Sequence, residues 1–165
     1  MFPQCPAVGL DTGCQVLITI GSGGKLSFAV DGSQSAYDGV EDVLVGVWNN
    51  SGTTQTSINL TGSGIFGFDG DGACSSGYLN CSGTSAPTGY EGYDNLGNFN
   101  SFNVTDTNTG SVVFGGGGLA AGGTAFFSLE GNPNAINGVS TPEPASLLLM
   151  GSGLMGLLLK RRKKA

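Results

Sequence analysis

The chain has 165 residues, of which 31 are glycine and 11% are charged, and this fits one glycine-rich domain with an appendage. Its net charge of -6 argues against nucleic-acid binding, which requires a basic surface. The sequence contains no histidine, and this excludes histidine-dependent nucleophile pairs and most metal-hydrolase sites.

The first residues do not look like an export signal. Residues 1–10 contain neither a basic n-region nor an apolar h-region. Because the features described below predict export, we expect the true start of the protein to lie upstream of Met1.

The four cysteines fall into two close pairs, Cys5 with Cys14 and Cys74 with Cys81. We predict these two disulfides, which belong in an oxidising compartment, although four cysteines permit three connectivities. A zinc site is the alternative, but the eight and six intervening residues do not match the short spacings of most zinc sites.

Short runs of β-branched and aromatic residues predict an all-β fold, a glycine-rich β-sandwich of about eight short strands. In chain order the predicted strands are 15–20, 26–30, 43–49, 56–61, 65–68, 99–104, 111–114 and 124–130. Residues 21–25 join the first two as a hairpin. They do not form a phosphate-binding loop, because Leu26 stands where that loop needs serine or threonine.

In two of the predicted strands the sequence pattern indicates which side chains are buried. In the first, Val16, Ile18 and Ile20 alternate with less apolar residues and predict one buried face. In the last, Phe126 and Phe127 are adjacent, so both are buried only if loops cover the second face of the sheet.

Calcium is the one cofactor that the acidic residues suggest. Asp69 and Asp71 alternate with glycine on a predicted loop, and further oxygen atoms are available from Asp38, Glu41, Asp42 and Asp94. Calcium takes six to eight oxygen ligands, but the EF-hand pattern fails at Ala73 and Cys74. Asp-Gly pairs also simply form turns, so both interpretations stay open.

Binding of a glycan would require exposed aromatic residues beside polar loops. The candidates are Tyr37, Trp48, Tyr90 and Tyr93, although Trp48 lies in a predicted strand and is expected in the core. Four Asn-X-Ser/Thr sequons, at Asn49, Asn59, Asn80 and Asn103, match chance expectation and are not interpreted as glycosylated. We expect no enzyme activity; Asp69, Asp71 and Glu91 are the candidates for a distant alternative, a glycoside hydrolase.

The C-terminal part has three segments in order. We predict a body over 1–131, a linker over 132–141 and a tail over 142–165. In the tail, Pro142, Glu143 and Pro144 precede an uncharged apolar stretch of 15 residues, 145–159. A basic run follows, formed by Lys160, Arg161, Arg162, Lys163 and Lys164.

The apolar stretch is a predicted transmembrane helix. As a helix it spans roughly 22 Å against a hydrocarbon core of about 30 Å, so flanking lysines and arginines must extend to the interface. A buried helix of a soluble domain would explain the leucines but not five adjacent basic residues. By the positive-inside rule the basic run stays cytoplasmic, and the acidic body faces outward.

Pro-Glu-Pro, a glycine-interrupted apolar span and an Arg/Lys cluster, in this order, closely resemble the PEP-CTERM sorting signal. The resemblance implies cleavage near Pro142-Glu143-Pro144 by an exosortase, a membrane transpeptidase-like enzyme of Gram-negative bacteria. It further implies transient residence in the inner membrane with the body in the periplasm, then release to the cell surface or outside. Such proteins accompany exopolysaccharide production and biofilm or floc formation. More loosely, residues 12–20, 37–52, 65–72 and 87–92 are similar to a recurrent exported region of that family.

These observations predict a structural or adhesive surface protein of an exopolysaccharide matrix. The expected partners are an exosortase, the inner membrane before processing and an exopolysaccharide, with no nucleic acid. A surface carbohydrate- or calcium-binding module is the alternative, and an exported glycoside hydrolase is the distant one.

Overall fold

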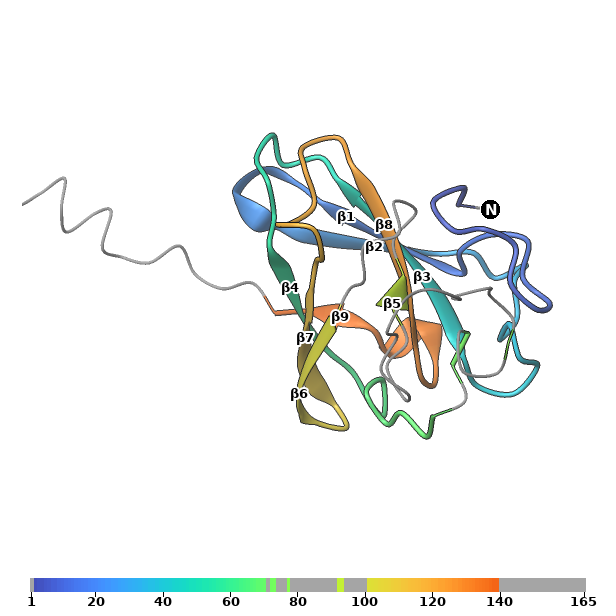
Figure 1. Ribbon diagram of the computed structural model, residues 1–165. Coiled ribbons are helices and arrows are strands. Elements are labelled where there is room, and N and C mark those ends of the chain that lie inside the picture. The colour runs from blue at the N-terminus through green and yellow to red at the C-terminus, as the bar shows by residue number, and fades with distance from the viewer. Residues whose placement is uncertain (1, 71, 74–76, 78–91, 94–100, 140–165) are drawn as a thin grey trace, which may run out of the picture.

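The computed structural model of the protein (Figure 1) describes residues 2–70, 72–73, 77, 92–93 and 101–139. Within this part of the chain the fold is all-β, as predicted, with nine strands in two sheets. The helical elements found there are two short 3-10 turns, η1 (Ser22–Gly24) and η2 (Pro133–Ala135).

The larger sheet has five strands in the order β2-β1-β3-β8-β5. They are β1 (Val16–Ile20), β2 (Leu26–Val30), β3 (Val43–Asn49), β5 (Gly92–Tyr93) and β8 (Thr124–Leu129). β1 pairs antiparallel with β2, which confirms the predicted hairpin, and parallel with β3, so the sheet is mixed. The hairpin turn contains Gly23 and Gly24 at φ 67° and 71°, a left-handed conformation that glycine adopts without strain.

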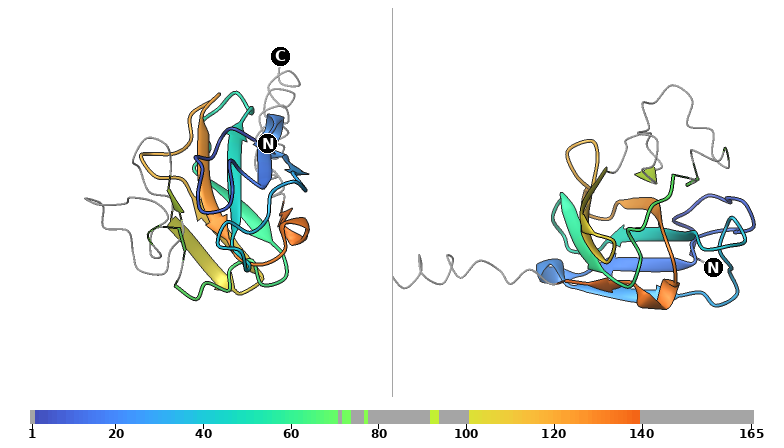
Figure 2. Two further views of the ribbon diagram at one scale, coloured as in Figure 1. Left: turned by 90° about the vertical axis from the view of Figure 1, so that its right-hand side faces the viewer. Right: turned by 90° about the horizontal axis from the view of Figure 1, so that it is seen from below.

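The smaller sheet has four strands in the order β6-β7-β4-β9. They are β4 (Ser57–Thr61), β6 (Ser101–Asp106), β7 (Thr109–Val113) and β9 (Asn137–Gly138). β6 and β7 form an antiparallel hairpin with a shift of register between Val104 and Asp106. Figure 2 shows the two sheets as separate layers.

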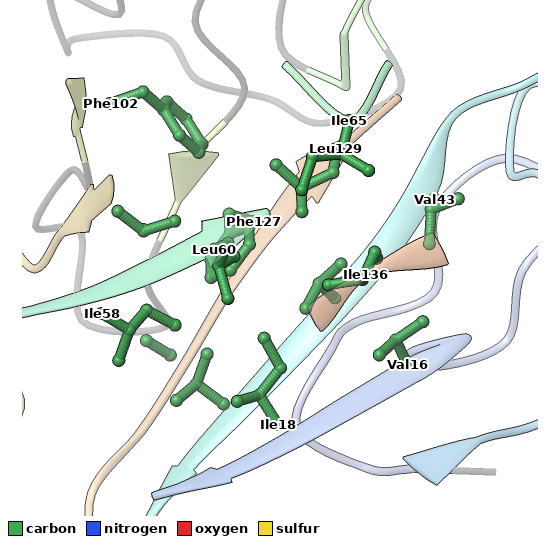
Figure 3. Close-up of a cluster of buried hydrophobic side chains, with 14 of the residues drawn as sticks. Val16, Ile18, Val43, Ile58, Leu60, Ile65, Phe102, Phe127, Leu129 and Ile136 are labelled. Atoms are coloured by element: carbon green, nitrogen blue, oxygen red, sulfur yellow. The ribbon is translucent and has the colours of Figure 1, made fainter. Parts of the chain in front are cut away.

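One hydrophobic core lies between the two sheets. Every second residue of β1, Val16, Ile18 and Ile20, is buried in it, which confirms the predicted buried face. The facing layer contributes Ile58 and Leu60 of β4, and Figure 3 shows these side chains pointing toward those of β1 and β8. The sheets therefore pack as a sandwich.

The outer face of the larger sheet is also covered in part. Phe127 belongs to the core between the sheets, whereas Phe126 belongs to a second buried cluster with Val8, Tyr37 and Leu44. The N-terminal segment builds this cover, and the predicted disulfide between Cys5 and Cys14 closes it, with an S–S distance of 1.99 Å. Both phenylalanines are thus buried because a loop covers the second face. Cys74 and Cys81 lie outside the described residues.

The cover requires a glycine in the sheet beneath it. A Cβ atom at Gly46 of β3 would collide with Sγ of Cys14 and would lie 2.9 Å from Cβ of Gln4. Any larger residue would push the disulfide segment away from the sheet.

Two predictions about residues in the first half of the chain are wrong. Residues 65–68 form no strand: Ile65 and Phe66 lie in a turn and are buried in the core, and the next two residues are irregular. Trp48 was expected in the core but is 38% exposed, because it lies on the outer face of β3 beyond the N-terminal cover.

The folded body also extends past the predicted boundary at residue 131. Ile136 is buried in the core, and β9 forms part of the smaller sheet, so most of the predicted linker 132–141 belongs to the body. Among the described residues no helix has the length and apolar character needed to cross a bilayer. The predicted transmembrane stretch 145–159 lies outside them.

Candidate functional site

The sorting tail lies outside the described residues, and this includes the Pro-Glu-Pro motif and the basic run 160–164. The structure does show how the chain reaches it. β9 pairs with β4, and N of Val139 donates a hydrogen bond to O of Asn59 at 3.0 Å. Only two residues separate Val139 from Pro142, so the proposed cleavage motif follows directly on a hydrogen-bonded edge of the smaller sheet.

The acidic residues suggested for calcium do not come together. Oδ1 of Asp38 accepts hydrogen bonds from the backbone N–H groups of Val40, Glu41 and Asp42, so it closes its own turn. Asp42 is buried, whereas Glu41 and Asp69 are exposed. Asp71, Glu91 and Asp94 lie outside the described residues. Within the part that the structure describes, no three acidic or cysteine residues are grouped as metal ligands would be.

One buried acid was not noticed in the sequence. Asp11 is 1% exposed and lies under the loop that contains Asp31 and Ser35. Burial raises the pKa of Asp11 to about 6, the backbone N–H of Ser35 opposes this increase, and the negative charge of Asp31 adds to it. No sequence pattern marks Asp11, because its burial depends on contacts made through the tertiary fold.

The aromatic candidates separate into buried and exposed residues. Tyr37 is fully buried in the second cluster and is a packing residue. Tyr90 lies outside the described residues, and only the backbone of Tyr93 is described, paired with Phe126 in β8. Among the four aromatic candidates, Trp48 is therefore the one whose side chain is described and exposed.

Trp48 is flanked by hydroxyl side chains on the outer face of the larger sheet. It pairs in register with Thr19 of β1 and Thr124 of β8, and Thr19 pairs in turn with Ser27 of β2. Directly paired residues share a face, so these four side chains form one row across four strands. An aromatic ring with hydroxyl neighbours can stack on a sugar ring and offer it hydrogen bonds.

A second polar surface, on the smaller sheet, was missed by the sequence analysis. An open cavity of about 300 Å³ lies on the outer face of this sheet, and we call it the small-sheet groove. Its polar lining is Asn59, Asn103, Thr105, Thr109 and Ser111. The polar residues alternate with buried ones along β4 and β7, which signals an outward face but not a cavity.

Comparison with known proteins identifies the tail. The family model for the PEP-CTERM protein-sorting motif matches residues 140–163. No curated protein matches the chain, and no solved structure matches it. The predicted resemblance is thus confirmed, and the motif marks a secreted protein with a C-terminal signal that an exosortase processes.

Proposed function

From the PEP-CTERM sorting motif that this chain carries, we infer that the body acts outside the cell as a structural or adhesive component of an exopolysaccharide or biofilm matrix. The motif at 140–163 is the observation that carries this proposal. The body fits it, because a disulfide, two sheets and covered faces suit a protein that persists in an oxidising environment.

Each part of the tail has a separate task in this proposal. The apolar stretch 145–159 holds the exported chain in the inner membrane, and the basic run 160–164 keeps the end cytoplasmic. Exosortase then cleaves near Pro142-Glu143-Pro144. Because β9 ends at Gly138, cleavage leaves the smaller sheet intact.

The body acts by binding rather than by catalysis. The absence of histidine from the sequence supports this role, and so does the exposure of Asp69 to solvent. Carbohydrate binding is the second candidate function, and the exposure of Trp48 within a row of hydroxyl residues favours it over calcium binding.

The sorting proposal is tested in the native host with an epitope tag placed in the body of the chromosomal copy. Parent protein is expected outside the cell, shortened at its C-terminus. Replacement of Pro142, Glu143 and Pro144 by alanine is expected to leave full-length protein in the inner membrane. Mass spectrometry of the C-terminal peptide and fractionation measure both effects.

Glu41→Ala is the matched control, because it removes one exposed carboxylate from the body and leaves the motif unchanged. This variant should be released like the parent. Normal shortening and release of the triple-alanine variant would contradict processing at the motif.

A further inference from the structure

The small-sheet groove crosses three strands of the smaller sheet. Asn59 of β4 pairs in register with Ser111 of β7, and Ser111 pairs with Asn103 of β6. The three side chains therefore form a row on one face. Thr109 and Thr105 line the same cavity, on β7 and β6.

The polar side chains of this groove are available to a ligand. Asn59 and Ser111 are half-buried and Asn103 is exposed, and within the described part of the chain none of these three side chains makes a hydrogen bond. An asparagine amide donates two hydrogen bonds and accepts through its oxygen, and a hydroxyl does both. Neighbouring hydroxyl groups of a sugar present the same combination of donors and acceptors.

The groove continues past the edge of the sheet. A second cavity of about 170 Å³ shares Asn59 and Val139 with it and reaches Gln55, Ser57 and Leu26. The two adjoining cavities form a path that crosses β4, which suits a chain of several units better than a single small molecule.

The charge of the groove and of the body indicates which class of polymer the groove binds. None of the described residues that line either cavity is charged. The sequence up to Glu143 contains twelve acidic residues and one basic residue, so the field around the body repels polyanions. A nucleic acid or an acidic polysaccharide would meet this repulsion without any compensating cation in the groove.

We propose that the small-sheet groove binds a neutral polysaccharide chain through the amides of Asn59 and Asn103 and the hydroxyls between them. This inference rests on the proposed extracellular role and gives it a ligand class and a site. The exposed side chain of Val139 offers an apolar edge against which the less polar face of a sugar ring packs.

The test uses the full-length chain, purified in a polyoxyethylene detergent without a sugar headgroup. Affinity electrophoresis in gels containing dextran, galactomannan or laminarin measures retention by neutral polymers, and alginate is the anionic comparison. The parent protein is expected to be retained by at least one neutral polymer and not by alginate. Retention by none of the neutral polymers, or by alginate alone, would overturn the proposal.

The variant Asn59→Ala/Asn103→Ala is expected to weaken retention at least tenfold while its thermal midpoint stays within a few degrees of the parent. Asn50→Ala, an exposed asparagine outside the groove, is the matched control and should bind like the parent. If the double variant does not fold, Ser111→Ala gives the same test with a smaller change. Parent-like binding by a folded groove variant, combined with loss of binding in Trp48→Ala, would place the site on the larger sheet and refute the inference.

This experiment is independent of sorting. Purified protein that binds glycan while the triple-alanine tail variant is still released would leave the groove assignment standing and remove the sorting proposal. Exosortase-dependent release without glycan binding would leave the sorting proposal standing and remove the groove assignment.

Discussion

Asn49 at the end of β3 is a polar residue on which two loops depend. Its side-chain nitrogen donates to O of Thr53 and of Leu119, both at 2.8 Å, and to O of Ala120 at 3.1 Å. Its oxygen accepts from the backbone N–H and hydroxyl of Ser51. The residue is fully buried, so it serves the fold and its sequon is inaccessible.

Asn49→Ala is expected to lower the free energy of unfolding by about 2–3 kcal/mol, because it removes the side-chain hydrogen bonds to three loop carbonyls and those from Ser51, although each of the three carbonyls keeps one other donor. Denaturant titration of the purified chain measures the change. Asn50→Ala is the matched control, because this neighbouring asparagine is exposed, and its effect should stay within about 0.5 kcal/mol. Equal stability of the two variants would show that the Asn49 network contributes little.

Asp11 makes the stability of the body depend on pH. Its pKa is raised to about 6 by burial, so the folded protein binds a proton more tightly than the unfolded chain does. The contribution of Asp11 is therefore most favourable at low pH and is lost as the pH rises from about 4 to about 6. Ionisation of Asp11 is therefore expected to make the parent less stable at pH 8 than at pH 4.

Asp11→Asn is expected to remove that loss and to raise the free energy of unfolding at pH 8 by about 1–2 kcal/mol, while changing it little at pH 4. Unfolding curves across this pH range measure the difference between variant and parent. Glu41→Gln, which changes an exposed carboxylate, serves for comparison. A difference between Asp11→Asn and parent that does not vary with pH would contradict the assignment.

At the scale of elements, the N-terminal cover and β3 stabilise each other through Gly46 and the disulfide. Replacing Cys5 and Cys14 with serine opens a loop with a sequence separation of 9 and is expected to cost about 2–3 kcal/mol. Gly46→Ala should cost a similar amount, on the order of 2 kcal/mol, because its Cβ would collide with the disulfide.

Because both changes act on one contact, their effects should not add. In the background without the disulfide the cover can move, so Gly46→Ala is expected to cost clearly less than in the parent. A double-mutant cycle in denaturant measures the coupling. Gly32→Ala is the control, since a Cβ there has nothing within 4 Å. Additive costs would mean that Gly46 is needed for another reason.

The strands that the sequence predicted best are those with turn residues at both ends. Residues 26–30 and 43–49 agree with β2 and β3, and glycine or asparagine lies close to these ends. Residues 65–68 are also apolar, but Ile65 and Phe66 fill the core from a turn. An apolar run shows that a segment is buried and does not by itself show its conformation.

The face on which a side chain lies was harder to predict. In β3 the residues from Val43 to Val47 are all buried, so no alternation of polar and apolar residues shows which side chains face the core. Trp48 is exposed only because the N-terminal cover ends before it. The small-sheet groove depends in the same way on which strands become neighbours. Such pairings are long-range, and no local pattern contains them. The sorting tail, in contrast, was found from sequence because its signal is a linear motif.

At the scale of the whole molecule, charge is divided between body and tail. Residues up to Glu143 carry a net charge of -11, and the basic run 160–164 carries +5. Cleavage near the motif removes the positive part, so the released body is more acidic than the chain held at the membrane. The mutual repulsion of its carboxylates then opposes compact folding more strongly.

The processed body is therefore expected to gain more thermal stability from salt than the full-length chain does. Most of the increase should occur below about 0.15 M NaCl, where the Debye length has fallen to about 8 Å, because further salt shortens the range of the repulsion only slightly. Thermal midpoints of both forms from 0.01 to 0.5 M NaCl measure it, and equal concentrations of sucrose control for solute effects without screening. A response that is linear up to 0.5 M, or equal in the two forms, would mean that repulsion within the body does not limit its stability. The same repulsion acts between the acidic body and an anionic polymer, which is a physical reason to look for its partner among neutral rather than acidic polysaccharides.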